Sequence, residues 1–542
     1  MPLVADRIAE LLQREGAESI VGFPENRLLN SASLAGMRPI ITRTERMAVN
    51  IADGFARATN GERLLPCVTQ YAPGAESAFG SVAQAYGDRS PILFLPSEHA
   101  VADQASAPNF RIEQAYAPIT RWRGTMNDAA HAPELFRRAL NAVRGVRNGP
   151  VLLALATDVL NGPPGDADWA LPPSRLRRSM ADPIDVERVA SLLIGASRPV
   201  ILAGQGVLYA QATAQLVALA EAIGAPVATT LNGKSAFPED HPLSLGTAAR
   251  TRPEPVDRFL GQADLILAVG SSLTRSLYIT PLPKQAAVAQ IVDDPADIGS
   301  GYAVEGACVG DAGLVLEQLR SALAAAGATP RSETAAELAP VRDGFRERWL
   351  PQLQADDAPL SPYRIVWELM QVADRTRTVV THDAGHPRDQ IVPFYETLVP
   401  RGYLGWGKST QLGTGMGLVM GAKLANPGWT AVNIMGDAAF GMVGMDFETA
   451  VRARLPILTI VMNNGLMGGY GEWMPDAVER DAANRLSGDY AGVGKALGGH
   501  TERVERPDEL RAALERCITS TQSGQAALLE VMTHEEHELA TG

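Results

Sequence analysis

The stretch TAVNIMGDAAFGMVGMDFETAVRARLPILTIVMNNG (430–465) contains two apolar strand patterns on either side of a helical one. Residues 430–435 and 457–462 have the composition of buried strands, whereas 445–454 has that of a helix. A crossover between two such strands is almost always right-handed and makes them parallel. We therefore predict a β-α-β unit in which polar residues follow both strands at the same sheet edge.

Asp437 follows the first of these strands and Asn464 follows the second. Both are expected at the carboxyl edge of the sheet, where open α/β sheets bind ligands. These two side chains and the backbone carbonyl of Leu466 would leave positions free on Mg²⁺ for a diphosphate and a water. The small residues Ala438 and Ala439 would let phosphates approach the backbone N–H groups. The alternative is a helix cap followed by a strand-ending asparagine pair, without any metal.

The same alternation of helices and short apolar strands runs through the whole chain, which predicts an α/β fold. A segment rich in proline and charge (161–179) and a second connector after about residue 325 separate three blocks. We predict three doubly wound parallel-sheet domains, at 1–165, 180–328 and 355–542. The patterns predict strands at 19–23, 38–42, 64–70, 91–96, 150–155, 199–204, 226–231, 265–270, 286–292, 378–385, 430–436, 457–464 and 527–532.

The composition limits the possible partners. The chain has 542 residues, of which 46% are hydrophobic, so it can form several packed cores. A net charge of −13 argues against nucleic acid or an anionic membrane as a partner. No apolar run reaches the ~18 residues of a membrane span, and the N-terminus lacks the apolar core of an export signal. Cys67, Cys308 and Cys517 show no metal spacing, which together with the other features predicts a cytoplasmic protein.

The Gly-Asp-Ala motif at 436–438 and the asparagine pair at 463–464 resemble the metal-diphosphate motif of thiamine-diphosphate-dependent enzymes. The segments GFPEN (22–26), TERMAVNIADGFARATNG (44–61) and NGKSAFPEDHPLSLG (232–246) extend the similarity over nearly the whole chain. Within that superfamily the chain is most similar to the acetolactate-synthase-like branch of 2-oxo acid decarboxylases and carboligases. The resemblance implies an N-terminal pyrimidine-binding domain, a central domain and a C-terminal diphosphate-binding domain. It also implies that Pro24, Gly436 and Met467 contact the cofactor.

Glu45 follows a predicted strand and lies in the first turn of a predicted helix. An acid in this position can simply favour the helix dipole. In the resembled family, however, this glutamate hydrogen-bonds the aminopyrimidine N1′ and stabilises the imino form, whose N4′ takes the thiazolium C2 proton. Leu412 corresponds to the bulky residue that keeps the cofactor bent, although a plain core leucine is the alternative. The resemblance further implies a homodimer or homotetramer, in which Glu45 and Asp437 of different subunits act on one cofactor.

Several residues are candidates for contact with the substrate, because they lie where members of the family line the site. A histidine or glutamate there could move protons on the substrate, while a surface or packing role is the alternative for each. The candidates are Gln70, Tyr71, His99, His386, Tyr470, Glu472 and Trp473. Acetolactate synthases usually carry His-Glu-Gln where this chain has Thr44-Glu45-Arg46, and Gly-Pro-Gly-Ala-Thr-Asn where it has APGAES. These departures leave the substrate and product open.

The expected function is cleavage or formation of a C–C bond on a 2-oxo acid or related small carbonyl substrate, with thiamine diphosphate and Mg²⁺. The first alternative is an enzyme of the 2-hydroxyacyl-CoA lyase or oxalyl-CoA decarboxylase type. The second is a non-catalytic regulatory paralogue, against which the joint presence of Glu45, Asp437 and Asn464 argues. The motif Gly204-Gln205-Gly206 follows a predicted strand and could hold FAD or ADP, but we expect an ordinary tight turn.

Overall fold

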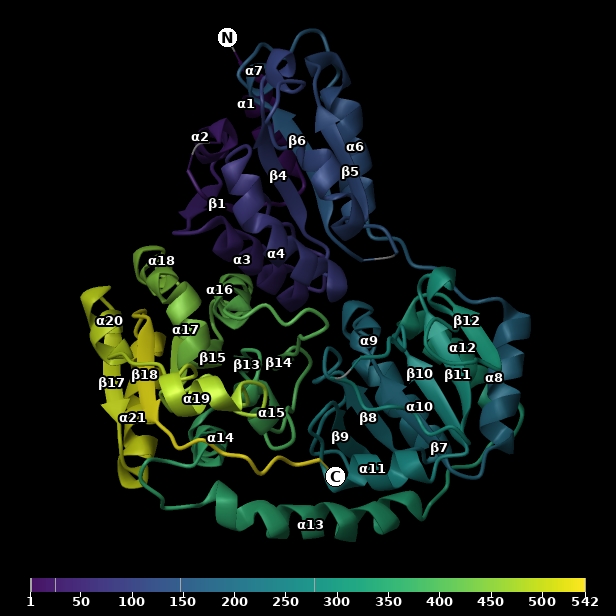
Figure 1. Ribbon diagram of the computed structural model, residues 1–542. Coiled ribbons are helices and arrows are strands. Elements are labelled where there is room, and N and C mark those ends of the chain that lie inside the picture. The colour runs from purple at the N-terminus through teal and green to yellow at the C-terminus, as the bar shows by residue number, and fades with distance from the viewer. Residues whose placement is uncertain (1, 25, 147, 277, 542) are drawn as a thin grey trace.

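The computed structural model describes residues 2–24, 26–146, 148–276 and 278–541. Within these residues the strands form three six-stranded sheets, each with helices on both faces (Figure 1). The N-terminal sheet runs in the order β2-β1-β3-β4-β6-β5, and all its strand pairs are parallel. Its strands are β1 (Ser19–Gly22), β2 (Arg38–Ile41), β3 (Cys67–Thr69), β4 (Leu93–Glu98), β5 (Trp122–Met126) and β6 (Val151–Ala156). Its helices are α1 (Val4–Arg14), α2 (Arg27–Leu34), α3 (Glu45–Ala58), α4 (Pro73–Gly87), α5 (Ile112–Ala115), α6 (Ala132–Val143) and α7 (Thr157–Leu160).

The central sheet is again wholly parallel and follows the order β12-β11-β10-β7-β8-β9. Its strands are β7 (Pro199–Ala203), β8 (Val227–Thr230), β9 (Ser244–Ala248), β10 (Leu265–Val269), β11 (Ala287–Val292) and β12 (Gly306–Val309). Its helices are α8 (Pro183–Gly195), α9 (Gln205–Tyr209), α10 (Thr213–Ile223), α11 (Glu254–Gly261) and α12 (Ala312–Ala325). The 20-residue helix α13 (Thr334–Leu353) then runs along the bottom of the molecule to the C-terminal domain (Figure 1).

The C-terminal sheet is parallel in the order β14-β13-β15-β16-β18-β17. Its strands are β13 (Thr378–His382), β14 (Tyr403–Leu404), β15 (Thr430–Gly436), β16 (Leu458–Asn463), β17 (His500–Val504) and β18 (Ala527–Met532). Its helices are α14 (Pro362–Val372), α15 (His386–Ile391), α16 (Thr414–Ala425), α17 (Asp437–Val443), α18 (Phe447–Arg452), α19 (Pro475–Asp481), α20 (Tyr490–Ala496) and α21 (Pro507–Gln522). The three parallel sheets confirm the predicted fold class and the predicted β-α-β unit at 430–465.

The N-terminal and C-terminal domains meet where helices α3 and α16 pack together, with glycines at the contact. A Cβ atom added to Gly54 would lie 2.1 Å from the carbonyl oxygen of Leu418, and one on Gly421 would lie 2.1 Å from that of Ile51. Since side chains would separate these backbones, glycine is required at both positions. Beside this contact, Arg57 forms a buried double ion pair with Asp53 at 2.6 Å and Asp88 at 3.1 Å.

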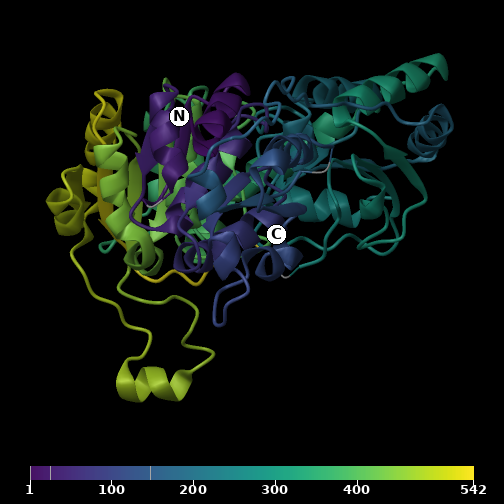
Figure 2. The same ribbon diagram turned by 90° about the horizontal axis from the view of Figure 1, so that it is seen from above.

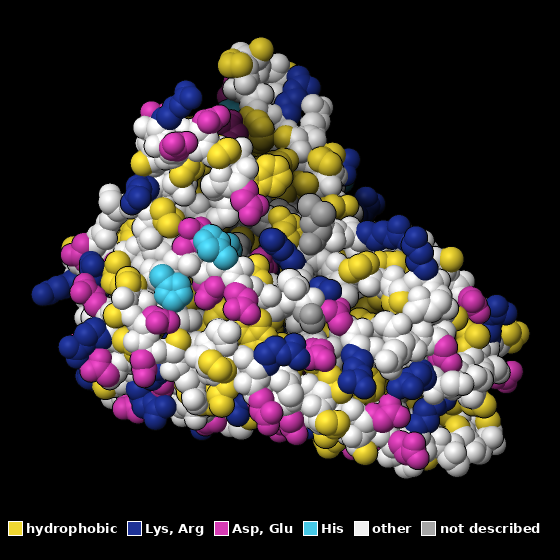
Figure 3. All heavy atoms as spheres, turned by 60° about the horizontal axis from the view of Figure 1, so that its bottom comes forward, with side chains coloured by type: hydrophobic (Ala, Val, Ile, Leu, Met, Phe, Trp, Pro, Cys, Tyr) yellow, Lys and Arg dark blue, Asp and Glu magenta, His cyan; other side chains and the backbone are white. Residues whose placement is uncertain are grey.

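Two views show further features of the surface. Figure 3, which brings the bottom of the molecule forward, shows positive and negative side chains interspersed over that face. Figure 2 shows α19 standing apart from the body at the end of two extended segments. Among the described helices, none is long and apolar enough to cross a lipid bilayer.

Candidate functional site

The predicted metal-diphosphate residues meet at the carboxyl edge of the C-terminal sheet. Strands β15 and β16 are neighbours, with Gly436 opposite Met462, so Asp437 lies beside the asparagine pair. The Asp437 carboxylate accepts hydrogen bonds from the N–H groups of Gly465, at 2.9 Å, and Ala438, at 2.8 Å. The amide oxygen of Asn464 accepts the N–H of Leu466 at 3.0 Å. The crossover therefore brings Asp437 beside the turn that contains Asn464 and Leu466, at the sheet edge that the sequence predicts.

The charge at this edge fits a divalent cation. Asp437 is 3% exposed, and burial raises the pKa of its carboxyl group. Among the described residues, no lysine, arginine or histidine forms an ion pair with it. A buried carboxylate without a cationic partner is costly, and a hard cation with oxygen ligands would compensate for it. Ala438 and Ala439 leave the beginning of α17 free of bulky side chains, so the residues present fit Mg²⁺ and a diphosphate.

The turn that carries Leu412 is held by an aspartate that sequence reasoning missed. Asp383 is completely buried after β13, and its two oxygens accept the N–H groups of Gly413 at 2.9 Å and Gly415 at 3.1 Å. Burial raises the pKa of Asp383 to about 6, although these hydrogen bonds act in the opposite direction and lower it. Gly413 has a φ of +88°, and a Cβ atom there would lie 2.5 Å from a Val443 methyl carbon. Leu412 is half-buried at this turn. The sequence did contain a signal for Asp383: an aspartate directly follows the buried strand β13, just as Asp437 directly follows β15.

Glu45 lies in the N-terminal domain at the first residue of α3, as predicted. Thr44 caps the helix by accepting the N–H of Met47 at 3.3 Å. Within one chain the Glu45 side chain is half-buried, and its Oε1 atom would lie 3.4 Å from a Cβ atom on Gly74. The same Cβ atom would lie 2.8 Å from the Cβ of Gln70. Gly74 therefore lets the backbone of α4 approach both Glu45 and Gln70.

The other N-terminal candidates lie at the same sheet edge. Tyr71 follows β3 and His99 follows β4, and their rings are 4.9 Å apart at an angle of 54°. The Nε2 atom of His99 is buried and has no hydrogen-bond partner among the described residues. The neighbouring Glu98 is 6% exposed, and burial raises the pKa of its carboxyl group. The fold thus gathers Glu45, Gln70, Tyr71 and His99 into one group.

Polar contacts within one chain join the beginning of α3 to the C-terminal domain. Asp446 accepts hydrogen bonds from the Arg43 N–H at 2.7 Å and the Thr44 hydroxyl at 2.8 Å. The Arg46 guanidinium donates to the carbonyl oxygen of Leu412. Sequence reasoning missed Asp446 and Arg46, because these contacts join residues 366 to 403 positions apart. They fix the position of Glu45 relative to the Leu412 turn of its own chain.

His386 begins α15 at the carboxyl end of β13, near the asparagine turn. A Cβ atom on Gly468 would lie 2.5 Å from the Nδ1 atom of His386, so the turn passes directly against the imidazole. Burial lowers the pKa of His386, which keeps the ring neutral near pH 7. The backbone N–H of Met467 donates to the carbonyl of Asn484 at 2.7 Å. His386 and Met467 therefore both lie at the C-terminal site.

The remaining candidates do not join either group within one chain. Tyr470 is 51% exposed and Trp473 is 85% exposed, and Glu472 is also exposed. All three belong to the segment that leads out to α19 (Figure 2). Pro24, after β1, is exposed too. Their contact with a cofactor or substrate stays a prediction.

The Gly-x-Gly motif of the central domain has a packing explanation. A Cβ atom on Gly204 would lie 2.3 Å from the carbonyl oxygen of Gly270, and one on Gly206 would lie 2.6 Å from the Cα of Gly270. The turns after β7 and β10 therefore touch through their backbones. This close approach of two backbones by itself explains why glycine is needed here, so the motif is not evidence for bound FAD or ADP.

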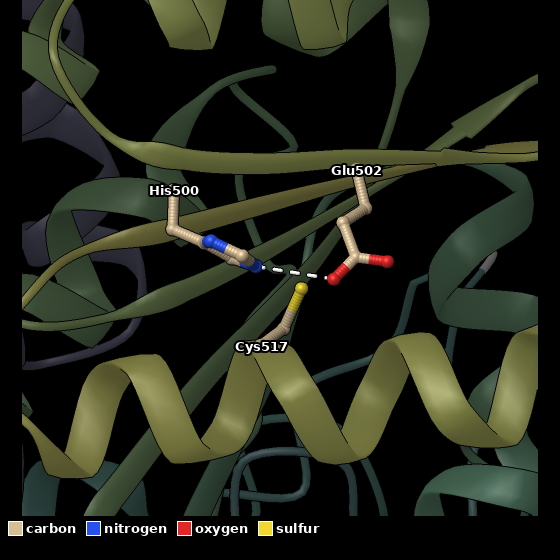
Figure 4. Close-up of side chains that lie close together, drawn as sticks. All are labelled: His500, Glu502 and Cys517. Atoms are coloured by element: carbon tan, nitrogen blue, oxygen red, sulfur yellow. Dashed lines mark hydrogen bonds and ion pairs between the residues drawn. The ribbon is translucent and has the colours of Figure 1, made fainter.

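A group of metal-ligand types lies at the far edge of the C-terminal sheet (Figure 4). His500 and Glu502 project from the same side of β17 and Cys517 from α21, with candidate ligand atoms within 4.8 Å of one another. Arg516, however, already donates to both carboxylate oxygens of Glu502, at 2.9 and 2.6 Å. Burial also raises the pKa of the Cys517 thiol to about 12. These contacts explain the group without a metal.

Comparison with known proteins agrees with this arrangement along the whole chain. Three family models match: the N-terminal TPP binding domain of thiamine pyrophosphate enzymes (residues 3–119), their central domain (186–319) and their C-terminal TPP binding domain (383–531). A probable acetolactate synthase large subunit of Methanocaldococcus jannaschii is 29% identical over 96% of this chain and 90% of its own length. A sulfoacetaldehyde acetyltransferase of Rhodobacter capsulatus is 27% identical over 98% of this chain and 94% of its own length. The crystal structure of a benzoylformate decarboxylase from Polynucleobacter necessarius has the same fold, with a TM-score of 0.82 and 20% identity over 99% of this chain and 100% of that one.

Proposed function

Because the chain belongs to the thiamine pyrophosphate enzymes, we propose that it cleaves or forms a C–C bond next to the carbonyl group of a 2-oxo acid. The proposed cofactors are thiamine diphosphate and Mg²⁺. When bound, thiamine diphosphate supplies the carbon nucleophile and electron sink that such reactions need. The acetolactate synthase and acetyltransferase activities named for relatives of similar length support a decarboxylase or carboligase.

One observation carries the proposal: a buried carboxylate, without a cationic partner among the described residues, lies beside the turn that holds an amide oxygen. We propose that Asp437, Asn464 and the carbonyl of Leu466 hold Mg²⁺. Ala438 and Ala439 would leave the adjacent backbone N–H groups accessible to the diphosphate. Asp383 would hold the Leu412 turn in place for the bound cofactor.

The N-terminal group would act on the other end of the cofactor and on the substrate. We propose that the Glu45 carboxyl group binds the pyrimidine ring of the cofactor and holds a proton on that ring. His386 is neutral near pH 7 and can therefore accept a proton from the substrate. Gln70, Tyr71 and His99 would contact the substrate from the N-terminal domain, and Tyr470, Glu472 and Trp473 from the α19 segment.

The proposed assembly is a homodimer or a homotetramer, with Glu45 of one subunit facing Asp437 of another. The exposed aromatic side chains of the α19 segment support an additional contact between chains. The proposal includes a cytoplasmic location, because all three cysteines are free thiols.

The activity test uses pure protein with Mg²⁺, thiamine diphosphate and a panel of 2-oxo acids, aldehydes and 2-hydroxyacyl-CoA thioesters. Products are identified by mass spectrometry. Glu45→Gln should lose turnover and still bind the cofactor, because the amide cannot exchange a proton as the acid does. Glu10→Gln, an exposed change in α1, is the matched control. Turnover of Glu45→Gln at the wild-type rate refutes the role of Glu45, and a protein that binds no cofactor refutes the whole proposal.

Mixing two inactive variants tests whether the site is shared between subunits. If Glu45 and Asp437 act from different chains, unfolding and refolding Glu45→Gln together with Asp437→Asn restores one intact site in each hybrid dimer. About a quarter of the wild-type rate should return, because half of the dimers are hybrids and one of their two sites is complete. No recovery, with hybrids shown by native mass spectrometry, would place both residues in the site of a single chain.

A further inference from the structure

A cavity of about 490 Å³ lies between the connecting helix α13 and the two domains that it joins. The central domain contributes residues near β9 and α11, and the C-terminal domain contributes residues of α14 and of the segment after α15. The cavity shares no lining residue with the candidate site at the carboxyl edges of the sheets. It is large enough for a small organic molecule.

One wall of the cavity is aromatic. Phe345 of α13 and Phe394 of the C-terminal domain stack with ring centroids 5.6 Å apart and planes within 8°. Both are buried, with 5% and 6% exposure, whereas Leu350, which also lines the cavity, is 38% exposed. A flat or branched apolar group that enters past Leu350 would therefore contact rings that are already fixed in place.

Two buried polar atoms in the same lining have no hydrogen-bond partner among the described residues. Tyr395 is 1% exposed, and its hydroxyl group has no hydrogen-bond partner among the described residues. The Nε atom of Arg342 is also buried without a partner in that part of the chain. Buried donors of this kind are rare in folded proteins, and each one needs an explanation. A bound molecule with acceptor oxygens would explain both the Tyr395 hydroxyl and the Arg342 Nε atom, because it could accept a hydrogen bond from each.

The half-buried Arg342 favours an anionic molecule, whereas Glu347 of the same lining is exposed and forms no ion pair among the described residues. Arg346 and Arg375 both form ion pairs with Glu396, and Glu239 forms one with Lys234 at 2.6 Å. Arg342, in contrast, donates only to the backbone carbonyl of His241, at 3.3 Å. Among the described residues, Arg342 is thus the arginine of this lining without a carboxylate partner. A carboxylate is the complementary group for a guanidinium.

We propose that this cavity binds a small organic acid with an aromatic or branched apolar body. Its carboxylate pairs with Arg342, its apolar body packs on Phe345 and Phe394, and the Tyr395 hydroxyl donates to one of its oxygens. Since the bound acid touches α13 and both adjoining domains, it stabilises their arrangement. This site is separate from the proposed catalytic function, and binding to it requires neither cofactor nor turnover.

The test uses 4-benzoylbenzoate as a photoreactive probe on the full-length protein. We expect crosslinks in the peptides that contain 342–353 or 393–396, and competition by 4-phenylbutyrate. The neutral 4-benzoylbenzamide should bind at least about tenfold more weakly, as expected for loss of one charge-assisted hydrogen bond. Arg342→Gln should abolish this preference for the acid, and Tyr395→Phe should weaken binding of the probe. Arg348→Gln is the control, because Arg348 lies on α13 but outside the lining and pairs with Glu254 at 2.6 Å.

Two further variants make the result decisive. Leu350→Trp enlarges an exposed side chain of the lining and should block labelling without disturbing a buried core. Glu45→Gln should be labelled like the wild type, so that a failure of the catalytic proposal is distinguished from a failure of this one. Crosslinks that fall mainly outside these peptides, equal binding of acid and amide, or full labelling of Leu350→Trp would each overturn the proposal.

Discussion

Gly421→Ala should weaken the contact between the N-terminal and C-terminal domains. The added Cβ atom would lie 2.1 Å from the carbonyl oxygen of Ile51 and 2.4 Å from the N atom of Phe55. Non-bonded atoms prefer about 3.5 Å or more, so α3 and α16 must separate by roughly 1 Å. Backbone atoms cannot rotate away, which places the cost near the upper end of ~1–3 kcal/mol for overpacking. Alanine regains about 1 kcal/mol of helix propensity, which leaves a net loss of about 2 kcal/mol.

Thermal unfolding followed by circular dichroism measures this loss. For a domain of this size, about 2 kcal/mol corresponds to a fall in Tm of about 4–8 °C. Gly344→Ala in α13 is the matched control, because its Cβ atom would meet nothing within 4 Å. The same substitution there should raise Tm slightly, through helix propensity alone. If Gly421→Ala melts at the wild-type temperature or above it, the close packing of α3 against α16 is refuted.

Three further predictions concern buried charges. Arg57→Met leaves Asp53 and Asp88 buried without their cation, so stability should fall by about 3–5 kcal/mol, and an unchanged Tm would contradict this ion-pair assignment. Burial raises the pKa of Asp383 from 3.8 to about 6. Between these two pH values the native state retains a proton that the unfolded state loses. The free energy of unfolding should therefore fall by about 3 kcal/mol as the pH rises from 3.8 to about 6. The Tm difference between wild type and Asp383→Asn should therefore change between pH 4 and 6 and stay level above about pH 7; a constant difference from pH 4 to 8 would refute the assignment. Asp437→Asn should raise the Mg²⁺ concentration for half-maximal thermal stabilisation in the presence of thiamine diphosphate by roughly tenfold or more, and an unaltered Mg²⁺ dependence would remove Asp437 from the metal site.

The central strands of each sheet could be predicted from sequence, whereas most of the edge strands could not. Buried parallel strands are continuous apolar runs, and every interior strand of the three sheets overlaps a predicted segment, although β4 and β6 extend one or two residues beyond theirs. The missed strands are β5, β9, β12, β14 and β17, all of which lie at sheet edges. An edge strand pairs on one side only and is partly exposed, as the residues of β17 are. Its sequence therefore lacks the apolar run on which the prediction depends.

The candidate site divides in a similar way. Asp437 and Asn464 could be paired from sequence because a single crossover joins their strands, and the geometry of a crossover is nearly invariant. The hydrogen bonds of Asp446 to Arg43 and Thr44 could not be predicted, because they depend on how two domains pack. The sequence prediction treated the segment after about residue 325 as a connector, whereas from Thr334 it forms a 20-residue helix with Pro340 and Pro351 inside it, although proline in a helix interior is normally unfavourable.

The sequence by itself determined the three parallel α/β domains and the pairing of Asp437 with Asn464. These features follow from local periodicity and from the fixed handedness of a strand-helix-strand unit. Only the tertiary structure decided that Asp383 holds the Leu412 turn, that glycines bring α3 against α16, and that Arg342 and Tyr395 line one cavity. Such contacts join distant parts of the chain, and they depend on the shapes of packed surfaces, which no short-range pattern in the sequence records.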